Sequence, residues 1–186
     1  MGGNRKEQRL SRYSYSENGA YFITICCENM SCLLGRIYAD SVDIRLTVGG
    51  GVPDAPFPGL RMELTECGRL VDDKIKEMNE QYKGVYVDNY VIMPNHIHLL
   101  LSIEPTEGAS RTPPPTVVNS RNNQRSNETV PQFVSYLKRS TNKESGLRIW
   151  QRGYHDHVIR DSNDYQIRWK YISDNPARWA EDEYYV

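Results

Sequence analysis

Residues 85–103 contain two β-type runs separated by a single turn signal, and this feature constrains the fold more than any other. The run at 85–93 (VYVDNYVIM) is rich in β-branched and aromatic residues, and the run at 96–103 (HIHLLLSI) is strongly apolar. Pro94-Asn95 between them is a typical turn dipeptide. The pattern predicts an antiparallel hairpin whose second strand is buried in a sheet.

The remaining patterns place helices and further strands around this hairpin. Residues 20–26 (AYFITIC) follow Asn18-Gly19 and predict a strand, and 33–38 and 157–160 predict two shorter ones. Apolar residues recur at helical spacing over 65–82, with Thr65 as N-cap, and over 130–143. A last helix is expected from Asp161 or Ser162 to about Asp174. The order of elements predicts an α+β fold with helices on one face of an antiparallel sheet.

The length and composition favour one domain. The chain has 186 residues, 38% of them hydrophobic, which suffices for one core. We expect a single domain over 1–186, with flexible insertions near 40–60 and 105–127, where Pro, Gly, Ser and Asn accumulate. The sequence has no apolar run long enough to span a membrane and a charged N-terminus, so the expectation is a soluble, cytoplasmic protein without a membrane partner.

Basic residues are unevenly distributed, although the net charge is only −1. Residues 111–160 hold nine Lys or Arg against three Asp or Glu. A concentrated basic segment is typical of a nucleic-acid surface, and it is also compatible with ordinary solvated charge. Basic side chains interleaved with aromatic ones suit single strands. The candidate DNA-binding residues are Arg121, Arg125, Lys138, Arg139, Lys143 and Arg152.

Two residue pairs have the spacing of a catalytic site. Alternate residues of a strand point to one face, so His96 and His98 would present two imidazoles side by side, as a metal site requires. Tyr171 and Asn175 are four residues apart on the last expected helix and would project from one face. Either pair alone is compatible with hydrogen bonding or packing.

Three separated blocks of the sequence resemble one known family. They are Tyr90 to Leu101 (YVIMPNHIHLLL), Ile149 to Arg160 (IWQRGYHDHVIR) and Tyr171 to Pro176 (YISDNP). In this order and combination they resemble the single-tyrosine HUH transposases, in particular the REP-associated tyrosine transposases and related insertion-sequence enzymes. The resemblance implies a ferredoxin-like sheet with the histidine strand central and the tyrosine helix packed across it.

The same resemblance implies roles for the two residue pairs. His96 and His98 match the histidines that hold Mg²⁺ or Mn²⁺ against the scissile phosphate, and Tyr171 matches the nucleophile. Asn175 falls where the family supplies a third metal ligand, often Gln, so its reach is one methylene shorter. The implied activity is cleavage and rejoining of single-stranded or hairpin DNA through a 5′-phosphotyrosine intermediate. Relatives include monomers and dimers, so a homodimer is open.

Several alternatives remain open at this point. His155 and His157 form a second His-x-His pair, for which a structural or DNA-contact role is favoured over metal binding. Tyr136 on the basic helix is the second candidate nucleophile. The chain could also be a DNA-binding transposase derivative without catalytic activity, or a zinc hydrolase unrelated to DNA, in which Tyr171 would have no role.

Overall fold

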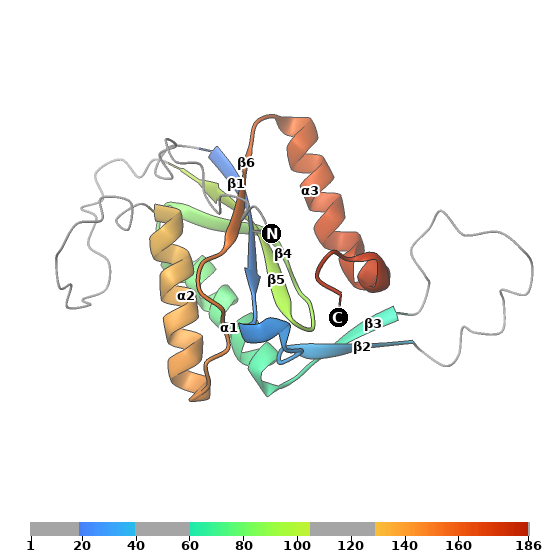
Figure 1. Cartoon of the computed structure of the whole chain (residues 1–186). Coiled ribbons are helices and arrows are strands. Elements are labelled where there is room, and N and C mark those ends of the chain that lie inside the picture. Colours follow the sequence, from blue (N-terminus) through green and yellow to red (C-terminus); the bar gives the residue numbers. More distant parts are fainter. Residues whose placement is uncertain (1–18, 40–59, 105–128, 186) are drawn as a thin grey trace, which may run out of the picture.

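The computed structural model describes residues 19–39, 60–104 and 129–185. Figure 1 shows their arrangement around one sheet. The elements in chain order are β1 (Gly19–Cys26), η1 (Glu28–Met30), β2 (Gly35–Ala39), β3 (Leu60–Leu64), α1 (Glu66–Gln81), β4 (Val85–Ile92), β5 (His96–Ile103), α2 (Thr129–Ser145), β6 (His155–Ile159), α3 (Ser162–Asp174) and η4 (Asn175–Glu181).

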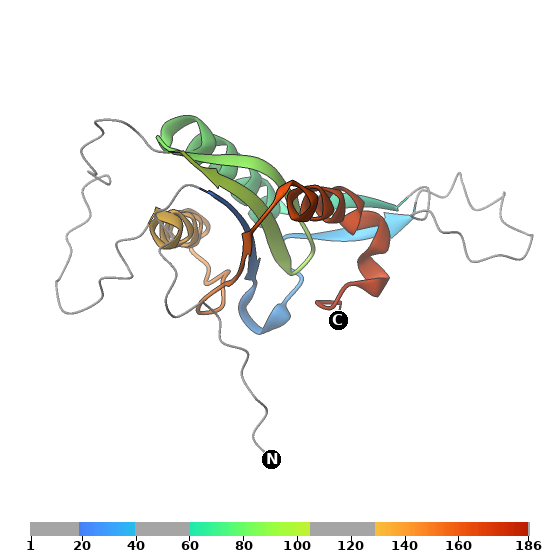
Figure 2. The ribbon, with the colours of Figure 1, turned by 90° about the horizontal axis from the view of Figure 1, so that it is seen from above.

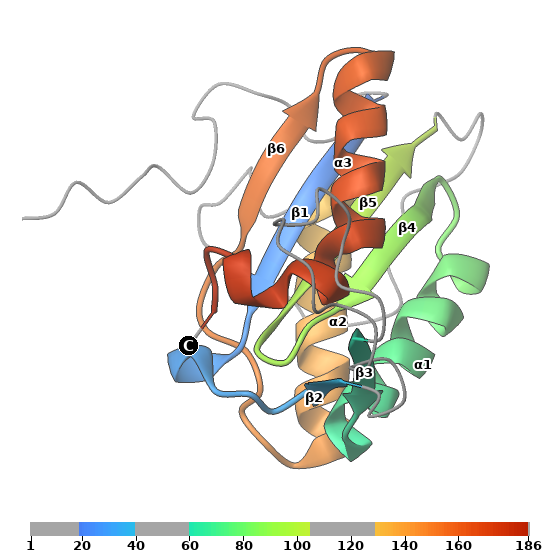
Figure 3. The same ribbon diagram turned by 90° about the vertical axis from the view of Figure 1, so that its right-hand side faces the viewer.

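The main sheet has four antiparallel strands in the order β4-β5-β1-β6, visible across Figure 3. Without the β2–β3 hairpin, the chain order through this sheet is β1-α1-β4-β5-α2-β6, which is the ferredoxin-like pattern. The expected fold class is therefore confirmed. The predicted hairpin is β4–β5, and β5 is an interior strand between β4 and β1.

Alternation along β1 and β5 divides the apolar residues between two layers. Tyr21, Ile23 and Ile25 of β1 belong to the main core with Ile97, Leu99 and Leu101 of β5, and α1 and α2 close this core with Ile75 and Phe133. Successive strand residues point to opposite faces, so the residues between them line the other side of the sheet. That side carries Phe22, His98 and Leu100.

The structure differs from the expected architecture in one detail. The helices do not all lie on the same face of the sheet. Figure 2 shows α3 on the side of the sheet opposite α2. Phe22 and Leu100 form a second, smaller core with Ile172 of α3. The reason is that this face of β1 and β5 is itself apolar at Phe22 and Leu100, so it also needs a cover. The helix carrying Tyr171 therefore packs across the face that presents His98.

Two differences from the expected elements concern the segment before α1. The strand expected at 33–38 is found at Gly35–Ala39, and it pairs with β3, which the sequence pattern did not predict. The expected insertions near 40–60 and 105–127 lie outside the described residues, except for Leu60, which begins β3. The single-domain expectation stays a prediction. Within the described residues, no helix has the length and apolar character needed to cross a membrane.

Helix α1 begins as predicted and depends on a close backbone contact. The Thr65 hydroxyl accepts a hydrogen bond from Gly68 N at 3.1 Å. A Cβ atom on Gly68 would lie 1.9 Å from the Leu34 carbonyl oxygen. We therefore expect Gly68→Ala to destabilise the fold by about 1–3 kcal/mol, the usual range for overpacking. Urea unfolding would measure this, with exposed Glu80→Ala as control, and an unchanged midpoint for Gly68→Ala would contradict it.

Candidate active site

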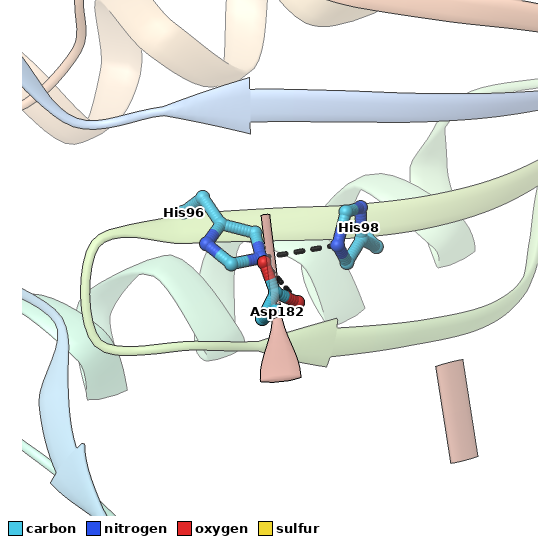
Figure 4. A group of neighbouring side chains, drawn as sticks. All are labelled: His96, His98 and Asp182. Atoms are coloured by element: carbon cyan, nitrogen blue, oxygen red, sulfur yellow. Dashed lines mark hydrogen bonds and ion pairs between the residues drawn. The ribbon is translucent and has the colours of Figure 1, made fainter. Parts of the chain in front are cut away.

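His96 and His98 form the centre of the candidate site. Their β5 register places both side chains on the face covered by α3, and both are buried, with exposed fractions of 0% and 1%. The two Nε2 atoms are 3.0 Å apart, and Figure 4 shows the rings projecting from one strand toward the same point. The side-by-side arrangement predicted from the His-x-His spacing is thus present in the structure.

Hydrogen bonds to the Nδ1 atoms of the two histidines indicate which tautomers they adopt. Asn95 Nδ2 donates to the Tyr184 carbonyl at 2.8 Å, which turns Asn95 Oδ1 toward His96 Nδ1, also at 2.8 Å. His96 Nδ1 must therefore carry the proton. The Thr24 hydroxyl lies 2.8 Å from His98 Nδ1 and bonds to the Tyr184 phenol, so it can accept from His98 in the same way. With this tautomer of His98, both Nε2 lone pairs face each other.

Burial keeps both imidazoles neutral. It lowers the pKa of His96 to about 4, and the carboxylate of Asp182 opposes this only in part. The pKa of His98 also falls well below its usual value, first through burial and then because protonating His98 beside His96 and Arg168 would bring positive charges together. Neutral imidazoles keep the lone pairs that a metal ion requires.

These lowered pKa values predict a loss of stability in mild acid. In the unfolded chain a histidine takes up a proton near pH 6.5, whereas folded His96 does so only near pH 4, so stability falls as the pH drops between these values. At pH 5 the loss from His96 alone is about 2 kcal/mol, or a Tm decrease of about 4–8 °C. Thermal unfolding with a chelator at pH 7.5 and 5 would measure it.

The His96→Asn variant is the matched control for this pH dependence. It should show a smaller Tm decrease between pH 7.5 and 5 than the parent protein, because one of the two histidines that resist protonation is gone. Equal decreases in the two proteins would mean that other groups cause the acid sensitivity.

Tyr171 lies on α3 directly above the histidine pair. Its ring is 5.2 Å from the His98 ring and 5.8 Å from the Phe22 ring, both edge to face. The side chain is partly exposed, and its hydroxyl donates to Asp182 Oδ2 at 3.3 Å. Burial, followed by the charge of Asp182, raises the pKa of Tyr171 to about 12. A phenol with this pKa would need a nearby cation to become a phenolate at neutral pH.

Asp182 belongs to this site and was not among the residues predicted from the sequence. It follows η4, and its side chain is only 2% exposed. His96, His98 and Asp182 each place a ligand atom within 4.8 Å of the others, and Figure 4 shows the carboxylate beside both rings. The signal available in the sequence was weak, because Asp182 is one of several acidic residues near the C-terminal end.

Asn175, the predicted third ligand, is also in this cluster. It is 3% exposed, and its Nδ2 donates to Asp182 Oδ2 at 3.0 Å. Its Oδ1 is buried and has no hydrogen-bond partner within the described part of the chain. A buried amide oxygen without a partner is unusual in a native fold and is available as a ligand atom.

The alternative site residues lie elsewhere. His157 Nε2 is 2.7 Å from Asp164 Oδ2, and this contact ties β6 to the first turn of α3. This agrees with a structural role for the second His-x-His pair. Tyr136 packs against Tyr82 beside the main core, on the α1–α2 side of the sheet. It is therefore separated by the sheet from His98 and Tyr171.

Among the predicted DNA-binding residues that the structure describes, Lys138, Arg139 and Lys143 lie on α2, across the sheet from α3. The Lys138 ammonium donates to the carbonyls of Gln151 and Gly153, which ties α2 to the following segment. Arg139, Lys143 and Arg152 are exposed. Arg121 and Arg125 lie outside the described residues. DNA contact by any of these side chains stays a prediction.

Comparisons with known proteins agree with this geometry. A family model described as "Transposase IS200 like" matches residues 65–175, more than half of the chain. An uncharacterized protein of Haemophilus influenzae is 30% identical over 189 residues, covering 98% of this chain and 94% of that protein. A solved structure of the REP-associated tyrosine transposase bound to a REP hairpin superposes with a TM-score of 0.56 at 15% identity, over 95% of this chain and 77% of the other. At that identity the likeness concerns the fold.

Proposed function

We propose a function from one premise: the chain belongs to the IS200-like transposase family, and it is a DNA transposase. In this proposal it cuts and rejoins single-stranded or hairpin DNA, with Tyr171 as the nucleophile and His96 and His98 as metal ligands. The observation that carries the proposal is the phenol of Tyr171 next to a buried pair of imidazoles whose Nε2 atoms are 3.0 Å apart.

The residues at the site fit a divalent metal ion. In the tautomers that direct both Nε2 lone pairs toward each other at 3.0 Å, a cation bound by both atoms would remove their repulsion. This separation suits adjacent ligands of an ion with bonds of about 2.1 Å. The unpartnered Oδ1 of Asn175 is a candidate third ligand. Imidazole and amide ligands suit Mn²⁺ and tolerate Mg²⁺. A bound ion of this kind would supply positive charge to the scissile phosphate and to the developing phenolate.

The chemistry assigned to Tyr171 balances without an external energy source. The Tyr171 oxygen bonds to phosphorus, the bond from phosphorus to the 3′ oxygen breaks, and the phenolic proton is released as the departing 3′ oxygen takes one up. The 5′-phosphotyrosine retains the bond energy, so a second 3′-OH can reverse the step and join strands. His98 and Phe22 fix the Tyr171 ring by edge-to-face contacts, so that little orientational freedom is lost at the moment of attack.

Single-stranded DNA is supported by the surface of α3 and by the relative of known structure. Trp169 and Tyr171 are exposed, and exposed aromatic rings can stack on unpaired bases. The REP-associated transposase of similar fold is bound to a hairpin. A single strand also lets the scissile phosphate reach a nucleophile that sits close to the sheet.

The direct test is a cleavage assay with end-labelled hairpin oligonucleotides, ideally from repeats flanking the gene, and Mn²⁺ or Mg²⁺. We expect metal-dependent cleavage of the hairpins and no cleavage of the corresponding blunt duplexes. Binding without cleavage across several hairpins and both metals would favour the DNA-binding derivative over the enzyme.

A further inference from the structure

Asp182 is the acidic side chain that the structure groups with His96 and His98, among the residues it describes. Resting on the proposed function, we propose that Asp182 is a carboxylate ligand of the ion held by His96 and His98. Its Oδ2 atom lies 3.9 Å from His96 Nε2. Asp182 directly follows η4, which begins at Asn175, so it lies outside the sequence blocks that indicated the site.

A cation beside this buried carboxylate would stabilise it. The Asp182 side chain is 2% exposed, and moving a carboxylate out of water costs several kcal/mol unless a positive charge lies beside it. The adjacent imidazole makes no direct hydrogen bond to the carboxylate, because His96 Nε2 lies 3.9 Å from Asp182 Oδ2. A divalent ion between the two imidazoles and the carboxylate would balance the charge.

Two hydrogen bonds orient the carboxylate toward the histidines. Tyr184 N donates to Oδ1 at 2.7 Å, and Asn175 Nδ2 donates to Oδ2 at 3.0 Å. Such outer contacts are typical of metal-ligating carboxylates, whose geometry is fixed by donors around them. The Tyr184 ring also packs 4.7 Å from the His96 ring, which anchors the segment after η4 against the site.

The assignment gives the ion a donor set that suits the expected metals. Mg²⁺ and Mn²⁺ prefer oxygen ligands, and two neutral imidazoles alone would equally favour zinc. A carboxylate supplies a hard oxygen and a negative charge. Because Tyr171 donates to the same Oδ2 at 3.3 Å, an ion bound there would lie next to the nucleophile.

The test is Mn²⁺ binding to the full chain without DNA, followed by electron paramagnetic resonance of the free ion. Asp182→Asn should weaken Mn²⁺ binding by at least about 10-fold, because it removes the charge while keeping the shape. The exposed neighbour Glu183 provides the matched control, and Glu183→Gln should bind as the parent does. Asp182→Glu, which keeps the carboxylate, should retain more affinity than Asp182→Asn. Thermal unfolding of each variant would check that it is folded.

The outcomes separate this inference from the proposed function. Equal Mn²⁺ affinity for Asp182→Asn and the parent would overturn the inference, and a rise in cleavage with that result would mean that the segment blocks the site. A parent protein that binds no Mn²⁺ would also overturn it. Loss of Mn²⁺ binding in Asp182→Asn, in a protein that cuts none of the hairpins, would support the ligand assignment and count against the proposed function.

Discussion

Replacing Tyr171 with phenylalanine is expected to abolish DNA cleavage and covalent attachment while hairpin binding persists. The substitution removes only the phenolic oxygen, which is the proposed nucleophile, and its contact with Asp182, and it leaves the ring that packs against His98 and Phe22. Without a nucleophile the rate should fall on the order of 10³-fold or more. Denaturing gels would measure cleavage and adduct, and a mobility-shift assay would measure binding.

Tyr136→Phe is the control for the Tyr171 prediction. Tyr136 is the other candidate nucleophile, but it packs against Tyr82 on the opposite side of the sheet. The Tyr136→Phe variant should therefore cut DNA at the parent rate. Full activity in Tyr171→Phe together with loss in Tyr136→Phe would reverse the assignment, and full activity in both would favour hydrolysis by an activated water.

Replacing either histidine of the pair with asparagine should have the second largest effect. In His96→Asn or His98→Asn the new amide would retain a polar group near the position of Nδ1, but it would lack the Nε2 lone pair directed at the site. We expect cleavage to fall by at least about 100-fold, since a metal ion contributes several kcal/mol to stabilising charge on a phosphate. Added Mn²⁺ should not restore the parent rate.

His157→Asn is the matched control for these variants. His157 belongs to the second His-x-His pair, and its side chain contacts Asp164 on α3, away from the cluster around Asp182. Its loss should leave the dependence of cleavage on Mn²⁺ concentration unchanged. If the Mn²⁺ dependence shifted for His157→Asn but not for His96→Asn or His98→Asn, the metal would be bound at the second His-x-His pair. That result would contradict the assignment of His96 and His98 as ligands.

Much of the fold could be predicted because its signals are local. The β-branched and aromatic residues of β1, the turn of the β4–β5 hairpin, the cap and spacing of α1, and the spacing of α2 are all signals between near neighbours in the sequence. Strand β3 was missed because it is five residues long and its partner β2 lies across a long segment of chain. The side of the sheet taken by α3 depends on a tertiary contact among Phe22, Leu100 and Ile172.

The site was predictable only to the extent that its residues have a regular spacing. The spacing of His96 and His98 predicted that they share one face of a strand. In the structure their rings do lie side by side, with the Nε2 atoms 3.0 Å apart. The resemblance to a known family brought Tyr171 and Asn175 into the same site. Asp182 follows a 3-10 helix, where no period relates one residue to another, and it reaches the histidines only because the chain turns back after η4.

The central claim is most directly tested by mass spectrometry of the protein after reaction with a hairpin oligonucleotide and Mn²⁺. Trypsin should release Tyr171 to Arg178, or a longer form beginning at Trp169, and each contains Tyr171 as its single tyrosine. After nuclease treatment, the account predicts a phosphonucleotide on this peptide and none in the chelator control. An adduct on the peptide that contains Tyr136, or cleaved DNA with no adduct on any peptide, would contradict it.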